Sequence, residues 1–292
     1  MVRSVGDWFE IAQTSGAILS WTEAFGGFEA FAGRSFNTQL PAHVHPSYVI
    51  GVVNGGAVRV TRGHESVVAT EGDIVALAPY DVHTEIAVGD EGWSFTYLYP
   101  TEANVRTALR VACAPNDTHA VLRFASPVIR NDRARRALEI AYELIVRRSS
   151  YRIAEMALAT LFELLAAECV ARAESYKLPK YRRGVETVRS IILQGSGATH
   201  SLRQLADIAG MSVYHFDRVF RNEVGLAAGA FFQRVRVARA HAMILRGHPL
   251  SDVWFKLGYA DQAHLTRHFH AASAFTPGQY AAIVKAARLP RG

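Results

Sequence analysis

Two histidines in the first third of the chain, His43 and His45, have the types and spacing of residues that bind a metal ion or a polar ligand. His43 and His45 are separated by one residue, so both side chains point to the same side of an extended segment. Further along the chain, His83 and Glu85 are also separated by one residue, so their side chains share a face of a second predicted strand. Three imidazoles can hold zinc or iron with open positions, or can hydrogen bond to an organic molecule. We expect ligand contact without a metal; metal ligation by His43, His45, His83 and Glu85, and a purely structural role, are the alternatives.

The histidines must be positioned by strands, because the chain up to residue 99 has the pattern of an antiparallel barrel or sandwich. Short segments rich in Val, Phe, Tyr and Thr are separated by glycine-bearing turns at 26–27, 54–56, 63 and 71–73. Asn54 and Gly55 both tolerate positive φ, so this pair predicts a hairpin turn. We expect residues 1–125 to form an effector-sensing barrel.

The last predicted strand carries aromatic side chains on one face. Trp93, Phe95, Tyr97 and Tyr99 alternate with Ser, Thr and Leu. A ligand cavity and an ordinary hydrophobic core would both require such a face, and the core is the commoner case. The residues that we expect to contact a ligand are His43, His45, Tyr48, His83, Trp93 and Tyr97.

Helical periodicity replaces the strand pattern after residue 127. Apolar residues at 134, 138, 141 and 145 define one stripe, and those at 153, 157, 161 and 164 define a second. The two amphipathic helices either pack on the barrel of their own chain or form a dimer interface, and both can hold. We expect residues 126–173 to be a helical dimerisation segment. Residues 174–183 carry Lys, Arg and Pro with little apolar periodicity, which predicts a linker.

The C-terminal part contains an internal repeat. The segment HFDRVFR at 215–221 returns as HLTRHFH at 264–270, and each copy follows a short apolar helix pattern that ends in glycine. Ser212 and Asp261 are placed to cap the second helix of each copy. The repeat predicts two helix-turn-helix units, about residues 202–223 and 250–273, within a DNA-binding domain of residues 184–286. A continuous helix from about residue 230 to 246, roughly 25 Å long, would hold the two units about one DNA turn apart.

Exposed side chains on the second helix of each unit are predicted to contact DNA. Arg218 is expected to pair with a guanine, Gln262 suits adenine, and Arg267 is the counterpart of Arg218 in the second unit. The predicted DNA-contacting residues are Tyr214, His215, Asp217, Arg218, Arg221, Gln262, Ala263, Thr266, Arg267 and His270.

The basic excess of the chain coincides with the repeat. Residues 180–292 hold 16 of the 32 Lys and Arg but only 6 of the 26 Asp and Glu. A basic domain attracts phosphates, although a basic face can also serve solubility alone. The two cysteines are far apart, the first residues do not form an export leader, and glutamates interrupt the apolar runs. We therefore expect a cytoplasmic protein without membrane contact.

Two stretches, PAHVH at 41–45 and GDIVALAPYDVH at 72–83, resemble the signature motifs of the cupin barrel. In metal-binding cupins the first stretch supplies two histidines and a carboxylate, and the second supplies a third histidine. His83 matches this third histidine, so the resemblance implies that it shares a site with His43 and His45. This chain has Val49 and Ile50 where the carboxylate would lie. The resemblance therefore implies a cupin-like barrel with an incomplete ligand set.

With the repeat and the segment TPGQY at 276–280, the whole chain resembles the AraC family of bacterial transcription regulators. Gly225 matches the glycine that ends the family's first recognition helix. The resemblance implies a multidomain α+β fold: an N-terminal antiparallel cupin-like β-barrel with two following helices, then an all-α domain with two helix-turn-helix units. It also implies a homodimer in the bacterial nucleoid that binds double-stranded promoter DNA and recruits or blocks RNA polymerase. Trp254, Ala274 and Ala228 depart from the family pattern, so we expect the first unit to read DNA more dependably than the second.

Together these features favour a sequence-specific transcription regulator, not an enzyme, whose barrel senses an unidentified small molecule without a cofactor. The alternative is a metal-dependent cupin enzyme, such as a dioxygenase or an isomerase, that carries a DNA-binding tail. A third hypothesis, an architectural DNA binder without an effector, is disfavoured by the aromatic strand face.

Overall fold

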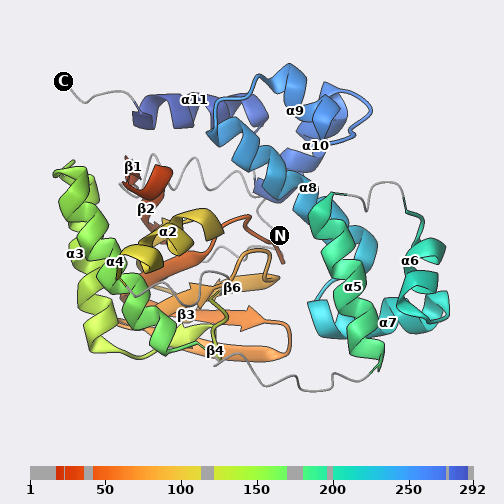
Figure 1. The fold of residues 1–292 in the computed structure, drawn as a ribbon, viewed down its shortest axis with the longest axis horizontal. Helices are drawn as coiled ribbons and strands as arrows, with labels where there is room; N and C mark the ends of the chain where they lie inside the picture. The colour runs from red at the N-terminus through yellow and green to blue at the C-terminus, as the bar shows by residue number, and fades with distance from the viewer. Residues whose placement is uncertain are drawn as a thin grey trace.

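The computed structural model describes residues 18–22, 24–35, 42–112, 122–169, 180–195, 200–273 and 276–288. Most of the predicted linker and Ala274 lie outside these ranges. A strand domain packs against two long helices on one side, and the C-terminal helices lie beside it and across one end (Figure 1). The strands are β1 (Ile18–Thr22), β2 (Phe28–Ser35), β3 (Val49–Arg62), β4 (Glu65–Thr70), β5 (Ile74–Leu77), β6 (His83–Ala87), β7 (Trp93–Tyr99) and β8 (Val128–Ile129), with a short 3-10 helix, η1 (Ala24–Gly26), after β1.

The strands pair antiparallel, as the sequence predicts. Strand β3 is central to the pairing. The order β1-β2-β7-β3-β5-β8 forms one path, and β4 and β6 also pair with β3. Residues 49–56 of β3 pair with β5 and β7, whereas residues 57–62 pair with β4 and β6. A single long strand therefore contributes to both sheets and connects the two walls of the barrel.

The predicted hairpin at Asn54-Gly55 is wrong. Both residues lie inside β3, where the register of pairing with β7 shifts between Val53 and Gly55. The Asn54 side chain donates a hydrogen bond to Thr96 Oγ1 (2.8 Å), and Gly56 has a positive φ of 75°. The permissive backbone of this segment forms a β-bulge, which bends the strand between its two sets of partners.

The two faces of β7 pack into different cores. Trp93, Phe95 and Tyr97 pack with valines of β3 in the barrel interior. Leu98 faces the other way and packs with Ile50 against the helices. The alternation predicted for this strand is confirmed, and the aromatic face lines the inside of the barrel.

Three helices follow in this half: α2 (Glu102–Ala112), α3 (Asp132–Val146) and α4 (Tyr151–Ala167). In α3 the buried residues are the four of the predicted stripe, at 134, 138, 141 and 145. In α4 the predicted stripe is only partly buried: Leu161 is fully buried, and Ala157 and Leu164 are half-buried. Ile153 is 53% exposed, while Ala154, Leu158 and Leu165 are buried. Because α4 is apolar around much of its circumference, periodicity alone did not identify the face that α2 and α3 cover.

The C-terminal helices form two small cores joined by one long helix. They are α5 (Lys180–Gln194), α6 (Leu202–Ala209), α7 (Val213–Val224), α8 (Ala228–Leu245), α9 (Leu250–Lys256), α10 (Gln262–Ser273) and α11 (Pro277–Arg288). Phe231 and Val235 of α8 pack with α5, α6 and α7, and its later residues Ala240 and Ile244 pack with α9, α10 and α11. Helix α8 corresponds to the connecting helix predicted from the sequence. No helix of the described ranges has the length and apolar content needed to cross a membrane.

Gly51 provides a test of the barrel packing. A Cβ atom at Gly51 would lie 1.8 Å from Cδ1 of Tyr97 and 2.4 Å from the backbone oxygen of Thr96. We expect Gly51→Ala to lower the free energy of unfolding by about 1–3 kcal/mol or more, because the added methyl group overpacks a closed core. Gly229→Ala is the matched control, since a Cβ there meets nothing within 4 Å. Thermal denaturation followed by circular dichroism measures both; equal melting temperatures would contradict the packing.

Candidate functional site

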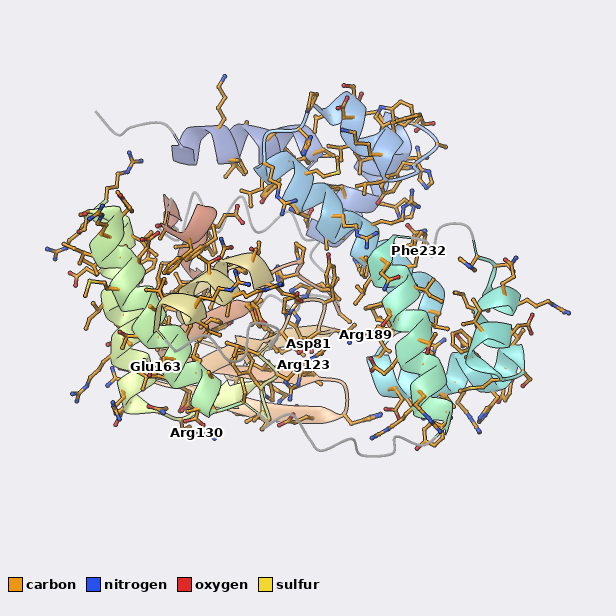
Figure 2. All side chains as sticks on the ribbon, in the orientation of Figure 1. Asp81, Arg123, Arg130, Glu163, Arg189 and Phe232 are labelled. Carbon is orange, nitrogen blue, oxygen red and sulfur yellow. The ribbon has the colours of Figure 1, made fainter. Side chains whose placement is uncertain are left out.

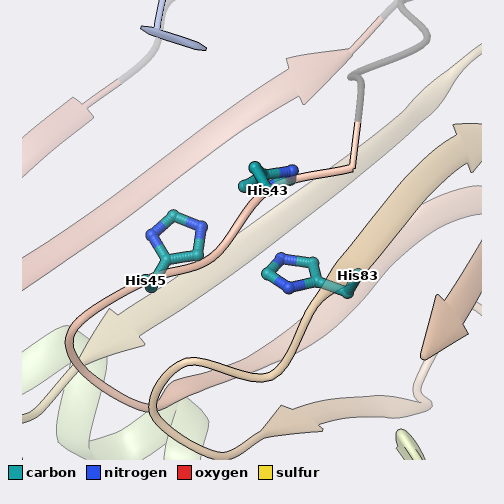
Figure 3. Close-up of side chains that lie close together, drawn as sticks. All are labelled: His43, His45 and His83. Carbon is teal, nitrogen blue, oxygen red and sulfur yellow. The ribbon is translucent and has the colours of Figure 1, made fainter. Parts of the chain in front are cut away.

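The three histidines come together at one end of the barrel (Figure 3). His43 and His83 exchange two backbone hydrogen bonds of 3.1 Å, which place their segments side by side. The ring centroids lie 4.2 Å apart for His43 and His83, and 5.4 Å apart for His45 and His83. One ligating nitrogen from each ring lies within 4.8 Å of the other two. The structure thus brings together the three histidines that the two cupin-like stretches predict to share a site.

His83 is held in one tautomer by its own turn. Its Nδ1 lies 2.9 Å from the backbone oxygen of Asp81, and a carbonyl oxygen can only accept, so Nδ1 carries the proton. Burial lowers the pKa of His83, and burial followed by repulsion from His83 and from His241 of α8 lowers the pKa of His45 well below its ordinary value. At neutral pH both imidazoles are uncharged, and Nε2 of His83 keeps a free lone pair.

The barrel interior next to the histidines carries the hydroxyl groups of two tyrosines and a buried carboxyl group. Tyr97 donates a 2.7 Å hydrogen bond to Glu85, and the Tyr99 ring lies 5.3 Å from the His45 ring. Burial raises the pKa of Glu85 to about 7. Glu85 is not part of the close histidine group, so the structure does not place it as a fourth ligand there. The residues expected to contact a ligand did not include Tyr99, although Tyr99 shares the aromatic face with Tyr97.

The two remaining residues predicted to contact a ligand, Trp93 and Tyr48, lie in different cores. Trp93 lies on the interior face, with its ring 4.5 Å from that of Phe95, at the start of β7 and away from the tyrosines at its end. Tyr48 packs in the other core, against the helices, where its hydroxyl accepts a hydrogen bond from the backbone N–H of Leu122. Its placement with the histidines is therefore wrong, because its side chain points to the outside of the barrel wall.

The first helix-turn-helix unit has the caps that the sequence predicts. Helix α6 ends at Gly210 with a left-handed φ of 69°, and the Ser212 hydroxyl accepts a hydrogen bond from the backbone N–H of His215 at the start of α7. Phe216 and Phe220 are fully buried, whereas Tyr214 on the opposite face is 80% exposed. The sharp turn and the buried phenylalanines present one face of α7 to solvent.

The exposed face of α7 is polar and its side chains are linked to each other. Arg221 pairs with Asp217 at 3.2 Å, and Arg218 Nη2 lies 3.4 Å from His215 Nδ1. These are exposed interactions of small net energy, so an external partner can replace them at little cost. All five residues predicted for this unit lie on α7, from Tyr214 to Arg221.

The second unit repeats the plan with different anchors. Gly258 has a φ of 70°, and Asp261 Oδ1 accepts a 2.6 Å hydrogen bond from the backbone N–H of His264. Gln262, Ala263, Arg267 and His270 are exposed on α10, and Thr266, half-buried, donates to the backbone oxygen of Gln262. Trp254 is half-buried against the core of this unit, so the helix junction accommodates the large ring.

The DNA-binding helices dock on the barrel beside the histidines. Val44 and Val82 belong to the same buried cluster as the side chains of α5, α6 and α7. Asp81 and Arg189 of α5 face each other across this junction (Figure 2), with a 3.8 Å ion pair and side chains only 15% and 11% exposed. A second contact joins the two domains elsewhere: the Tyr280 hydroxyl of α11 donates a 3.0 Å hydrogen bond to Glu29 Oε1 on β2. No local sequence signal identifies this interface, because each partner is an ordinary strand, loop or helix residue.

Comparisons with known proteins agree with this architecture. The model of the AraC-like ligand binding domain matches residues 25–162, and a helix-turn-helix domain model matches residues 205–283. The HTH-type transcriptional regulator YbfI of Bacillus subtilis, itself uncharacterized, is 21% identical over 81% of this chain and 85% of its own length. An HTH-type transcriptional regulator of Mycobacterium tuberculosis is 31% identical over 86 residues, which are 29% of this chain and 33% of that protein.

Solved structures show the same fold. The crystal structure of ToxT from Vibrio cholerae superposes with a TM-score of 0.50 at 10% identity, and an apo ToxT variant with 0.51 at 13% identity. Each comparison covers 92% of this chain and 97% of the ToxT chain.

A ligand-binding barrel joined to two helix-turn-helix units defines a transcription regulator that reads DNA and senses a small molecule in one chain. The two family models together span most of the sequence. The chain belongs to the AraC family of transcription regulators.

Docking of the two domains depends on Val82, which is 6% exposed. We expect Val82→Asp to separate the domains, because it places a carboxylate in the apolar contact with α7. Small-angle X-ray scattering should then show a larger radius of gyration. Val88→Asp is the matched control, since Val88 is 39% exposed, and it should scatter like the wild type. An unchanged profile for Val82→Asp, with the fold intact by circular dichroism, would refute the docking contact.

Proposed function

We propose that the first helix-turn-helix unit provides the sequence-specific contacts of this regulator. The supporting observation is the division of α7 into a fully buried phenylalanine face and an exposed face that carries Tyr214 and Arg218. The N-terminal residues of such a helix reach base edges in the major groove, and an arginine there forms a bidentate pair with guanine. Helix α10 adds a second set of contacts, with Gln262 and Arg267 as its base-reading residues.

Substitution of Arg218 separates base reading from phosphate attraction. We expect Arg218→Ala to weaken binding to the specific site by about 1–3 kcal/mol and to relax the preference at one base pair. Lys180→Ala, at the start of α5, should weaken specific and random duplexes equally, because a lysine that contacts phosphate carries no sequence information. Fluorescence anisotropy with both duplexes at fixed salt measures the difference. Equal losses on both duplexes for Arg218→Ala would contradict base reading.

The effector site that we propose is the polar end of the barrel interior. His45, His83, Tyr97 and Tyr99 supply hydrogen-bonding groups there, and the rings of β7 supply an apolar wall. This combination suits a small molecule with an apolar body and a polar head. One solved ToxT structure holds an unsaturated fatty acid, at a TM-score of 0.50 and 11% identity to this chain. The relatives are named as regulators, which favours sensing over catalysis in this barrel.

We further propose that the protein acts as a homodimer on promoter DNA in the cytoplasm and contacts RNA polymerase there. Support for the dimer comes from exposed apolar side chains on α3 and α4: Ile140 is 54% exposed, Ile153 53% and Met156 69%. An apolar surface of this kind on consecutive helices is typical of a protein–protein contact. Support for the polymerase contact is membership of a family of transcription regulators.

A charge on this helical face should dissociate the dimer. We expect Met156→Glu to sediment as a monomer in analytical ultracentrifugation at concentrations where the wild type is a dimer, because two carboxylates would be buried at the interface. Val111→Glu is the control, since Val111 is an exposed apolar residue (66%) on α2. A monomeric wild type, or equal effects of both variants, would exclude α4 as the dimer surface.

A further inference from the structure

Glu85 is a buried carboxyl group whose role the contacts with DNA do not explain. Its side chain lies in the barrel interior opposite Val60 of β3 and is 7% exposed. One carboxyl oxygen, Oε1, accepts the 2.7 Å hydrogen bond from Tyr97. Among the described residues, no hydrogen bond reaches the other oxygen, Oε2. A carboxylate removed from water is costly unless a cation or hydrogen-bond donors compensate it, so Oε2 has room for a donor from outside the chain.

No positive side chain of the described ranges balances this carboxylate. Arg62 of β3 pairs instead with Glu65, at 2.9 Å, and Glu85 forms no ion pair there. The neighbouring imidazoles of His45 and His83 are uncharged at neutral pH, because burial lowers the pKa of both. An anionic ligand at this end of the barrel would therefore meet a carboxyl group and no counter-charge.

Two carboxylates make this end of the barrel electrostatically negative. Burial, and then the charges of Glu85 and Glu29, raise the pKa of the Tyr99 hydroxyl well above its ordinary value. Both carboxylates therefore lie close enough to Tyr99 to act on it through surroundings of low dielectric constant. The same field that disfavours a negative phenolate favours a positive group placed beside these residues.

Aromatic rings of β7 adjoin the carboxylate. The Tyr97 ring lies 4.7 Å from the Phe95 ring and 6.1 Å from the Tyr99 ring. It packs directly on Gly51, where a Cβ atom would be 1.8 Å from its Cδ1, so the hydroxyl is held toward Glu85. The faces of aromatic rings attract cations, and their area suits an apolar body. A carboxylate beside such rings has the chemistry that recognises an organic cation.

We propose that the effector is an amine with an apolar body, bound as its ammonium ion through Oε2 of Glu85. The inference rests on the proposed effector site and names the class of its ligand. An ammonium group carries only donors, and it finds a second acceptor in Nε2 of His83, on the same face of β6, because Nδ1 of that ring donates to the backbone oxygen of Asp81. The apolar body lies against the rings of β7.

Matched probes that differ only in their polar head test the proposal on the full-length protein. We expect 2-phenylethylamine and hexylamine to raise the melting temperature, since a ligand that binds only the native state stabilises it, and phenylacetate to leave it unchanged. Glu85→Gln keeps an acceptor for Tyr97 but removes the charge. It should weaken amine binding, measured by isothermal titration calorimetry, by about 10- to 100-fold. Glu71→Gln, at an exposed position, controls for general attraction to surface carboxylates.

No stabilisation by either amine, equal stabilisation by phenylacetate, or unchanged amine affinity in Glu85→Gln would overturn the inference. If Glu85→Gln does not fold, the comparison of amines with phenylacetate on the wild type decides alone. The proposed effector site is tested separately with 2-phenylethanol and Tyr97→Phe. Stabilisation by the alcohol or by phenylacetate, but not by the amines, that is lost in Tyr97→Phe would contradict the ammonium ligand and leave the effector site in place.

Discussion

The turn at residues 78–83 orients His83 in the barrel and also contacts the DNA-binding domain. The contact between the two domains depends on this turn. Asp81 accepts a hydrogen bond from the backbone N–H of Ala78 (3.1 Å), holds His83 through its own backbone oxygen, and faces Arg189 of the DNA-binding domain. Val82 is buried by helices of that domain. A ligand that moves His83 must therefore disturb the contact with α5 and α7. Because packed interfaces resist gradual deformation, such a disturbance favours a switch between docked and released arrangements.

Helix α8 joins the two helix-turn-helix units into one body. Its side chains are buried in both small cores, from Phe231 and Val235 at one end to Ile244 at the other. A helix enclosed in this way fixes the distance and angle between α7 and α10. The two units then move as one body relative to the barrel, and the contact of Tyr280 with Glu29 on β2 gives the second unit its own attachment to the sensor. Release of the domain from the barrel requires that both contacts open.

Local features were predictable from the sequence, and tertiary ones were not. The caps at Ser212 and Asp261 and the buried stripe of α3 follow from hydrogen-bonding chemistry and periodicity within a few residues. Asn54-Gly55 does not form a hairpin turn. The positive φ of this segment is at Gly56, and the irregular pairing with β7 forms a bulge inside β3. Tyr48 packs against the helices instead of the histidines, because an aromatic residue next to a strand can face either side of the barrel wall and the sequence does not say which. The ion pair of Asp81 with Arg189 joins residues far apart in sequence, and no pattern of spacing encodes it.

The two helix-turn-helix units differ in how their turns are fixed, which bears on how each reads DNA. In the first, α5 lies so close to the end of α6 that a Cβ at Gly184 would be 2.5 Å from the backbone oxygen of Ala209. In the second, the buried Arg236 donates to the backbone oxygen of Leu257 and stacks 3.7 Å above the Tyr259 ring. Burial lowers the pKa of Arg236, so this anchor keeps a desolvated charge that the tight helix packing of the first unit avoids. The first turn is held by backbone packing and the second by a polar group. The geometry of the second turn therefore depends more on electrostatics than that of the first, because a buried guanidinium holds it.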